Sequence, residues 1–430
     1  MADLCTQTLP EHWKYVAEGG ASMVFSYRGP VHPTYTGRVL RLRKVPLNSV
    51  EAELNSTEES QDHAGYSIAF DDAVIRRLIP EQFLPRLESV LMDSKWLETL
   101  SQLTEHERPR ERRTKHTVDT RQTRALLAPD LLGNEGIAVE IKPKWGFLPS
   151  PAYLSPSTRP IKARTCRFCM HTHMKYAECE TVAVTFCPLD LYSGDETRVR
   201  RALLALWDSW IASPGEINNL RVFTGGRLVR FTHDSAAFID IARVLDSYSS
   251  STQLDPRSQP EDLRDRLISS LIPPLLEMPV LRILSSLQRT LDKLDIEGLA
   301  SLWARAHAAI IPAPALGEGL SEPTLEEWTL FIEEYFSKTS TAVESELHVH
   351  ELRHYCLAYL LSATFKDCSI MVKIDFPNVN RDNVKTSLHI IDLDVKSISR
   401  LAKWQKLDRE IVAAYANVEP RNCVDQWAPQ

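Results

Sequence analysis

The sequence predicts a mixed α/β protein of two lobes, a smaller strand-rich lobe over residues 1–132 and a larger lobe over residues 133–430. The larger lobe should carry an inserted, mostly helical region at about residues 245–345. Three observations predict this architecture. The 430 residues exceed what one hydrophobic core usually holds, and 43% hydrophobic with 25% charged residues is typical of globular proteins. Strand patterns open the chain and recur near its end, with helical patterns between them.

The amino-terminal elements begin with residues 13–27, which read as two strands joined by a turn at Gly19 and Gly20. Residues 38–44 alternate apolar and basic side chains, which is typical of a strand with one buried face. Helical patterns follow at residues 70–78 and 80–100. The apolar residues 125–132, interrupted by Pro129, predict a connection between the lobes.

In the larger lobe, residues 136–139 are a short apolar run that predicts a strand. Ser193 and Glu196 have the spacing of a capping box, so we expect a helix to begin there. Further helices are predicted near residues 284–294, 324–336 and 344–364, and strands at residues 370–376 and 388–393.

Composition narrows the functional class. No run approaches the ~20 apolar residues of a membrane span, and the first residues lack the pattern of a signal peptide. We therefore expect an intracellular protein whose eight cysteines are reduced thiols. A net charge of −7 argues against general nucleic-acid affinity. Seven cations nevertheless fall within residues 108–124, either as a solvated basic loop or as a field suited to a small, dense anion.

Residues 140–149, read as EIKPKWGFLP, are the most informative stretch. Prolines fix the backbone on both sides of a glycine, and Lys142 and Lys144 point the same way if the segment is extended. Two ammonium groups side by side repel each other unless an anion lies between them. The run therefore predicts either a polyanion site or an ordinary solvated turn.

EIKPKWGFLP resembles the signature of the inositol-pentakisphosphate 2-kinase family, which adds the last phosphate of inositol hexakisphosphate. The resemblance extends from about residue 13 to about residue 412, through EGGASMVF, NNLRVF, KDCSIMV and IIDLDVK in the family's order. A glycine turn between strands, a basic residue on the next strand and two late aspartates also follow the order of a kinase-like fold. The resemblance implies ATP between two lobes, Mg²⁺, and inositol pentakisphosphate as the substrate.

For ATP, the resemblance implies that the glycine turn covers the phosphates with backbone amides, and that Arg41 contacts them from the following strand. A glycine hairpin could equally be a simple turn. The residues expected to bind the nucleotide are Gly19, Gly20, Ala21, Ser22, Arg41, Glu140, Asn219 and Arg221.

For catalysis, phosphoryl transfer requires one carboxylate beside the attacking hydroxyl and another on the metal. By resemblance, Asp367 is the base that faces the 2-hydroxyl and Asp392 is the Mg²⁺ ligand. Asp394 is an auxiliary candidate. Each aspartate taken alone could be a turn or a helix cap.

For the inositol phosphate, Lys396, Arg400 and Trp404 recur every four residues and would share one face of a helix. Such a stripe could also be a solvated amphipathic face. The family usually has tyrosine where this chain has Trp404, and indole cannot accept a hydrogen bond. The residues expected to bind substrate are Lys142, Lys144, Lys175, Asn218, Lys396, Arg400, Trp404 and Arg112.

The run CRFCMHTHMK supports two interpretations. Cys166, Cys169 and His171 could begin a zinc site, completed by Cys179 or Cys187. We favour the family's R-F-x-M-H pattern, in which Lys175 meets a substrate phosphate. The rival functions are a zinc-stabilised RNA- or protein-binding module and an inert inositol phosphate sensor. We expect a monomer in the nucleus or cytoplasm that binds neither membrane nor nucleic acid.

Overall fold

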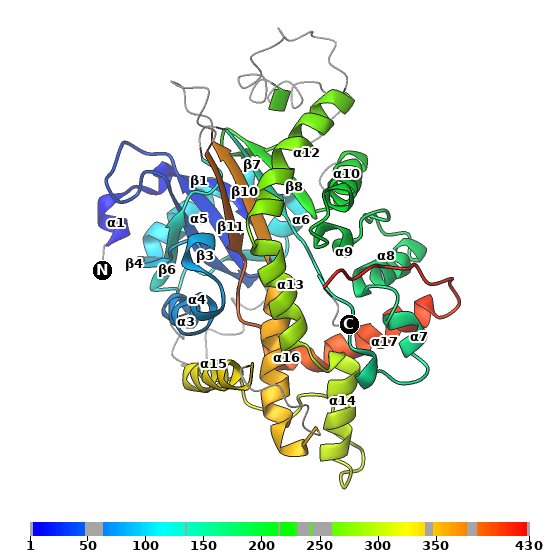
Figure 1. Ribbon diagram of the computed structural model, residues 1–430. Helices are drawn as coiled ribbons and strands as arrows, with labels where there is room; N and C mark the ends of the chain where they lie inside the picture. Colours follow the sequence, from blue (N-terminus) through cyan, green and yellow to red (C-terminus); the bar gives the residue numbers. More distant parts are fainter. Residues whose placement is uncertain are drawn as a thin grey trace.

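The computed structural model describes residues 3–47, 63–133, 136–213, 216–229, 241–242, 260–339, 347–375 and 385–427. It has a mixed α/β fold with two antiparallel sheets and surrounding helices (Figure 1). Parts of the predicted insert, residues 245–259 and 340–345, lie outside the described residues.

The first sheet is built from the amino-terminal part of the chain. Its strand order is β1-β2-β3-β6-β4, and β5 pairs with β3. Every pairing is antiparallel. Its strands are β1 (Trp13–Glu18), β2 (Ser22–Tyr27), β3 (Arg38–Pro46), β4 (Glu88–Leu91), β5 (His116–Val118) and β6 (Arg124–Pro129). The helices beside it are α1 (Leu4–Gln7), α5 (Ser94–Thr104) and α6 (Arg110–Arg113), and a core around Trp13, Phe25 and Leu97 joins sheet and helices.

The second sheet has the order β11-β10-β7-β8-β9, again antiparallel throughout. Its strands are β7 (Ile137–Ile141), β8 (Leu220–Thr224), β9 (Arg227–Leu228), β10 (Ser369–Asp375) and β11 (Lys385–Ile391). All five residues of β7 are buried. Ile137 and Val139 join the large core that the helices cover, while Ala138 belongs to a smaller apolar cluster on the other side of the strand.

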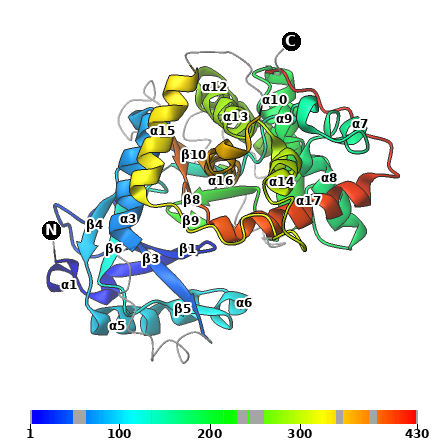
Figure 2. The same ribbon diagram turned by 90° about the horizontal axis from the view of Figure 1, so that it is seen from below.

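Helices cover the face of the second sheet that carries Ile137 and Val139. The large core includes residues of α10 (Glu196–Ala212), α12 (Pro260–Glu277), α13 (Val280–Leu291) and α16 (Leu352–Lys366). The other helices are α3 (His63–Phe70), α4 (Arg76–Leu78), α7 (Arg159–Lys162), α8 (Arg167–Ala177), α9 (Pro188–Leu191), α14 (Asp295–Ala306), α15 (Leu325–Thr339) and α17 (Leu401–Tyr415). Seen from below, α15 packs along α3, and the first sheet lies to one side of the later helices (Figure 2). Phe70 and Val74 thereby contribute to the large core.

Several predicted elements are wrong in detail. Residues 80–100 are not one helix, because β4 lies within them and pairs with β6. Residues 125–132 are largely the strand β6, in which Pro129 sits at the end opposite Arg38. The side chain that caps α10 is that of Asp195, which accepts from the amide of Arg198, and not that of Ser193.

Among the described residues, no single helix has the length and hydropathy of a membrane span. Residues 262–277 and 280–306 reach those values only as a pair, and they are bent by 59° at their junction.

Candidate active site

The predicted site residues gather at one end of the second sheet. Ser369, which begins β10, is paired with Ile391, which ends β11, so Asp367 and Asp392 flank the same sheet end. Ile141, which ends β7, is paired with both Ile370 and Leu220. Because neighbouring strands run antiparallel, the segments after β7 and β11 and before β8 and β10 meet here. The lysines of the run after β7 and the asparagines before β8 therefore reach the same edge as the two aspartates.

A hydrogen-bonded chain links the four strands that meet here. The Ser369 hydroxyl donates to Glu140 Oε1 at 2.9 Å and contacts Asp392 Oδ2 at 3.4 Å. Arg221 donates to Glu140 Oε2 at 3.3 Å. Glu140, predicted to bind nucleotide, is thus held on both carboxylate oxygens by neighbouring strands.

The backbone adopts unusual conformations at two site residues. Lys144 and Asp392 both have φ of 62°, in the left-handed region that residues other than glycine seldom adopt. Such conformations cluster at functional sites, where the surrounding structure holds them in place. Because Lys144 adopts a left-handed conformation, residues 142–144 are not extended, and the condition under which Lys142 and Lys144 would point the same way is not met.

Residues predicted to bind ATP line a pocket of about 230 Å³ between the two sheets, which we call the glycine-turn pocket. One wall is the turn with Gly19, Gly20 and Ser22, and apolar side chains such as those of Val39 and Met371 form another part of its lining. The other predicted residues that line it are Arg41, Arg112, Glu140, Lys142, Asn218, Arg221 and Asp392. Ala21 lines a separate pocket, of about 460 Å³, which also includes Ser22, Arg41 and Asp392.

The two glycines have no structural reason to be glycine in this conformation. A Cβ added to Gly19 or Gly20 would meet nothing within 4 Å, and neither residue is in the left-handed region. Gly19 and Gly20 are exposed and line the pocket without side chains, although the Gly19 amide already donates to the Ser22 carbonyl at 2.9 Å. The backbone that follows Gly19 is therefore the part of the turn that suits phosphate oxygens.

Arg41 connects the first sheet to the aspartates. It lies on β3 opposite Val24, and its guanidinium lies 3.8 Å from Asp392 Oδ1 and 3.7 Å from Asp394 Oδ2. The carboxylates are about half exposed, at 42% and 52% of their side-chain surface, so they remain accessible to a cation from the pocket.

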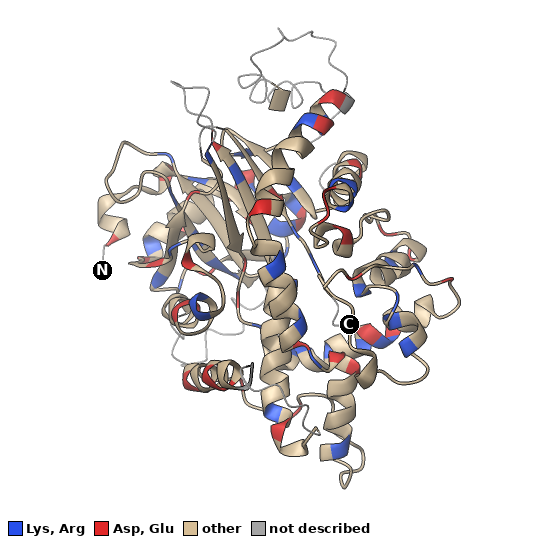
Figure 3. Cartoon of the chain, in the orientation of Figure 1, with Lys and Arg blue, Asp and Glu red and all other residues tan. Residues whose placement is uncertain are grey.

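The residues predicted to bind inositol phosphate line a second pocket, of about 500 Å³, which we call the basic pocket. Lys144, Lys175, Asn218, Lys396, Arg400 and Trp404 line it, together with Asp367. Arg167, Lys366 and His171 add nitrogen-bearing side chains that we did not predict to bind substrate, and Asn219 borders this pocket rather than the glycine-turn pocket. Lys and Arg recur on α8 and α17, which pack together (Figure 3).

Two expected placements are wrong. Lys142 and Lys144 line adjoining pockets rather than one, because of the turn at Lys144. Lys396 precedes the helical residues, since Arg400 ends a 3₁₀ turn over Ile398–Arg400 and only Trp404 lies on α17. Lys396, Arg400 and Trp404 nevertheless converge on the basic pocket.

Asp367 is held by cations at the boundary of the basic pocket. Lys396 Nζ donates to its Oδ2 at 2.9 Å. Burial raises the pKa of Asp367, but the charge and hydrogen bond of Lys396, followed by the charges of Lys144 and Lys142, leave that pKa below its ordinary value. The carboxylate is therefore ionised at neutral pH and able to accept a proton. Burial also lowers the pKa of Lys144, which Asp367 only partly offsets.

Lys175 already has an acidic partner. Its Nζ donates to Glu180 Oε2 at 2.7 Å, and both side chains are partly exposed at the basic pocket. A bound anion would therefore compete with Glu180 for this ammonium.

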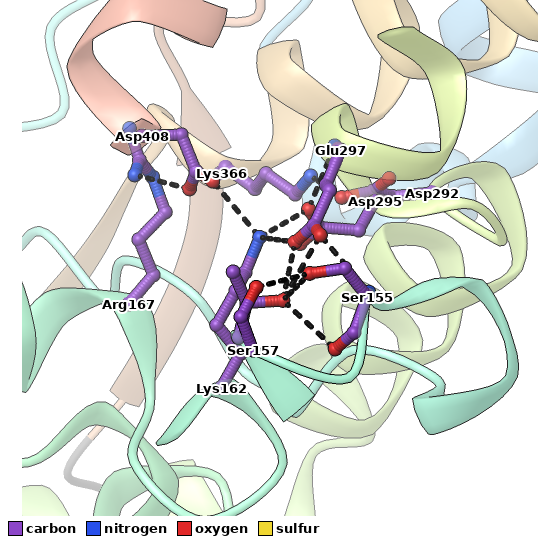
Figure 4. Close-up of polar contacts among 10 residues, drawn as sticks. Ser155, Ser157, Lys162, Arg167, Asp292, Asp295, Glu297, Lys366 and Asp408 are labelled. Carbon is purple, nitrogen blue, oxygen red and sulfur yellow. Dashed lines mark hydrogen bonds and ion pairs between the residues drawn. The ribbon is translucent and has the colours of Figure 1, made fainter. Parts of the chain in front are cut away.

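A network of buried charged side chains lies next to the basic pocket and includes Arg167 and Lys366 from its lining (Figure 4). Lys162 Nζ donates to Asp295 Oδ1 at 2.5 Å and to Asp408 Oδ2 at 2.9 Å. The other oxygen of Asp408 accepts from Arg167 at 3.0 Å. Burial lowers the pKa of Lys162, but Asp295 and Asp408 outweigh that effect and raise it. Sequence reasoning missed these ion pairs because the two partners of each pair lie more than 100 residues apart.

The second branch of the network involves Lys366, the residue before Asp367. Its Nζ donates to Asp292 Oδ2 at 2.5 Å, and it lies 4.7 Å from the ring centroid of Tyr359. The Trp145 ring contacts both cations: its centroid lies 3.9 Å from this ammonium and 5.1 Å from the guanidinium carbon of Arg167. Trp145 thereby links the two branches.

The predicted zinc candidate set is also corrected. Cys166 and Cys169 lie together with Cys187 and Cys423, whereas His171 lines the basic pocket. The distant Cys423 gave no signal in the sequence, because it is an isolated cysteine near the end of the chain.

Comparison with known proteins places the chain in a family. A sequence model described as inositol-pentakisphosphate 2-kinase matches residues 15–410. A protein named inositol-pentakisphosphate 2-kinase from Cryptococcus neoformans var. neoformans serotype D is 32% identical over 418 residues, which cover 94% of this chain and 93% of the relative. Proteins of the same name from Danio rerio and Arabidopsis thaliana are each 26% identical, over 94% of this chain and 92% and 93% of their own lengths. The chain therefore belongs to the inositol-pentakisphosphate 2-kinase family.

Proposed function

We propose that the chain is an ATP-dependent kinase that phosphorylates the 2-hydroxyl of inositol 1,3,4,5,6-pentakisphosphate to give inositol hexakisphosphate. The observation that carries this proposal is the juxtaposition at one sheet end of a cation-lined pocket, Asp367, and a second pocket that contains Asp392. A polyanionic substrate and a nucleotide would occupy adjoining pockets, with the carboxylates at their junction.

We also propose a two-lobed, kinase-like arrangement, divided between residues 1–132 and 133–430. Its support is that one sheet is built from strands before residue 130 and the other from strands after residue 136. The glycine-turn pocket lies between these sheets, which is where a kinase-like fold would hold ATP.

ATP would enter the glycine-turn pocket with its phosphates under Gly19 and Gly20 and its base against apolar side chains. The described residues also suit Mg²⁺, because Asp392 and Asp394 offer half-exposed carboxylates, the hard oxygen ligands that this ion prefers. When bound, Mg²⁺ would neutralise charge on the phosphates. Arg41, whose guanidinium faces both carboxylates, would contact the γ-phosphate from the first sheet.

In the basic pocket, Lys144, Lys175, Lys396 and Arg400 would hold the existing phosphates, with Lys142 and Arg112 approaching from the adjoining pocket. Asp367 would then face the remaining hydroxyl and accept its proton as the oxygen attacks the γ-phosphate in line. Substrate phosphates would also draw Lys396 away from Asp367, which would make that carboxylate a stronger base.

Isothermal titration of pentakisphosphate, with and without Mg·ATP, followed by analysis for product tests the proposal. We expect tight binding in both conditions and turnover only with Mg·ATP. Binding without turnover would identify an inert sensor, and absence of binding would contradict the assignment of the basic pocket. Residence in the nucleus or cytoplasm and a monomeric state remain predictions.

A further inference from the structure

A buried amide side chain of the helical region contacts two segments of the candidate site at once. Gln288 lies on α13 and is fully buried. Its Oε1 accepts from the amide of Gly146 at 2.7 Å, and its Nε2 donates to the carbonyls of Lys144 at 3.0 Å and Phe365 at 2.9 Å. One side chain thus joins the lysine-bearing run after β7 to the last turn of α16, which immediately precedes Asp367.

A carboxamide is the chemical group that fits these partners. The Gly146 amide is a donor, whereas the two carbonyls and the Tyr192 hydroxyl, at 3.2 Å, offer oxygens to Nε2. A neutral amide accepts and donates at the same time, while a carboxylate only accepts and an ammonium only donates. The Phe365 carbonyl lies in the last turn of α16, where carbonyls lack partners within the helix, so the bond from Gln288 supplies one.

The turn that carries Lys144 is held from behind by α13 and by Tyr192. Lys144 adopts a left-handed conformation that is unfavourable for a residue with a Cβ, so the turn needs contacts that hold it. Ser285, one turn before Gln288, donates to the Gly146 carbonyl at 2.7 Å, so both backbone polar groups of Gly146 bind the same helix. The Tyr192 hydroxyl donates to the Lys144 carbonyl at 3.2 Å, and a Cβ at position 146 would lie 2.8 Å from the Tyr192 ring. The glycine therefore lets the turn pack closely against both partners.

We propose that Gln288 is a positioning residue that sets where the Lys144 ammonium stands relative to the Asp367 carboxylate. Both of these side chains line the basic pocket, whereas α13 itself, all of whose residues are described, lines neither that pocket nor the glycine-turn pocket. The inference rests on the proposed kinase function, in which Lys144 holds a substrate phosphate and Asp367 accepts the proton. It gives the helical region a role in catalysis, which is to hold the two segments that meet the substrate.

The nucleotide side of the site is held by a different contact. Lys142, which lines the glycine-turn pocket, donates its backbone amide to the Asn219 carbonyl at 2.9 Å. This bond continues the pairing of β7 with β8. We therefore expect loss of the Gln288 amide to affect the inositol phosphate and the proton transfer, and to leave the binding of ATP unchanged.

Steady-state kinetics of Gln288→Met test the proposal, because methionine keeps the length of the side chain and removes both polar groups. We expect the KM for inositol pentakisphosphate to rise and kcat to fall by roughly tenfold each, since small displacements of reacting groups are costly. The KM for ATP should stay within about twofold of the wild type. Kinetic constants of Gln288→Met that match the wild type would overturn the proposal.

The matched control is Leu281→Ala on the same helix. Leu281 is buried in the large core, so its truncation should lower stability through a cavity and leave kcat and both KM values unchanged. If Leu281→Ala changes the kinetic constants as Gln288→Met does, the effect comes from a weakened helix and the proposal is wrong. Should Gln288→Met fail to fold, Ser285→Ala, which removes only the bond to the Gly146 carbonyl, should still raise the KM for inositol pentakisphosphate. An unchanged KM in that variant would overturn the proposal.

Hydrogen exchange at the Gly146 amide gives a readout that does not involve activity. This amide is buried and bonded to Gln288 in the wild type, so it should be protected. In Gln288→Met its exchange should be at least about tenfold faster, while the amide of Val139 within β7 keeps its protection. Unchanged protection of Gly146 would contradict the proposal. A wild-type protein without kinase activity would refute the proposed function instead, and the exchange result alone would then decide whether Gln288 holds the turn.

Discussion

The ammonium of Lys366 lies 3.9 Å from the centroid of the Trp145 ring, which connects the residue before Asp367 to the run that contains Lys142 and Lys144. Lys366 is buried and its counter-ion is Asp292, 2.5 Å away and 3% exposed. Asp292 Oδ1 has no hydrogen-bond partner among the described residues. The Lys366 ammonium is therefore the main group that balances the charge of the buried Asp292 carboxylate next to the basic pocket.

For the Lys366–Asp292 pair, we expect loss of one partner to destabilise the protein much more than loss of both. Lys366→Met should lower the free energy of unfolding by about 3–5 kcal/mol, because it leaves a buried charge without a partner. The double variant Lys366→Met/Asp292→Leu should recover most of this loss. Urea unfolding followed by tryptophan fluorescence measures both. Lys293→Met, an exposed lysine next to Asp292, is the control and should change stability little. Equal destabilisation by the single and double variants would contradict the role of the pair.

Substitutions in the glycine turn should weaken the binding of ATP without changing the stability of the fold. Gly19→Ala and Gly20→Ala should leave unfolding within about 0.5 kcal/mol of the wild type, because an added Cβ meets nothing within 4 Å. They should raise the KM for ATP by roughly tenfold, since a methyl group on the turn would obstruct the approach of the phosphates to the exposed backbone of the turn.

The control for this separation is Gly37→Ala. Gly37 has a φ of +75° and lines neither pocket, so its replacement should cost about 1–2 kcal/mol of stability and leave the KM for ATP unchanged. If Gly19→Ala and Gly20→Ala weaken the fold and leave ATP binding intact, the turn is structural.

Asp367 predicts a loss of turnover without a loss of binding. Asp367→Asn removes the proton acceptor but keeps the size of the side chain, so kcat should fall by roughly 10²–10⁴-fold. Calorimetry should show nearly unchanged affinity for inositol pentakisphosphate. Asp375→Asn, at the far end of β10, is the matched control and should retain full activity. Substantial turnover by Asp367→Asn would exclude this residue as the base.

The contact between Lys396 and Asp367 predicts a change in pH dependence. In the free protein the pKa of Asp367 lies below its ordinary value, so a base at this position stays ionised, and kcat/KM should show no acid limb from it above about pH 4. Lys396→Met removes the largest lowering influence while burial still raises the pKa. An acid limb should therefore appear in the kcat/KM of the variant at a higher pH than in the wild type.

The ratio of variant to wild-type kcat/KM against pH isolates this effect, because titration of the substrate phosphates is common to both proteins. Lys403→Met, an exposed lysine on α17, is the control and should give a flat ratio. A flat ratio for Lys396→Met as well would show that Asp367 does not titrate as the base.

The sequence predicted individual strands and turns more accurately than the ends of elements and the contacts between distant segments. The hairpin around Gly19, the strands β3 and β10 and the convergence of Asp367 with Asp392 followed from local patterns and motif order. Residues 125–132 were predicted as a connection because proline is disfavoured inside a strand. Pro129 in fact ends β6, where proline is tolerated, and the sequence alone does not show where a strand ends. Lys396 was assigned to a helix because spacing alone does not reveal where α17 begins.

Long-range contacts lay beyond sequence reasoning. The Lys162 ammonium is neutralised by Asp295 and Asp408, residues 133 and 246 positions away, and the sequence carries no signal that joins them. Cys423 is likewise brought to Cys187 only by the packing of the carboxy-terminal segment. Such partners are fixed by tertiary structure, so a periodic pattern cannot identify them.

The most direct test of the central claim is the position of the new phosphate after incubation with Mg·ATP and inositol 1,3,4,5,6-pentakisphosphate, read by ³¹P NMR of the purified product. If the basic pocket presents the free hydroxyl to Asp367, the product is inositol hexakisphosphate, with its new phosphate as a monoester on carbon 2. A product that carries a diphosphate on an existing phosphate, or no phosphorylated product at all, would contradict the account.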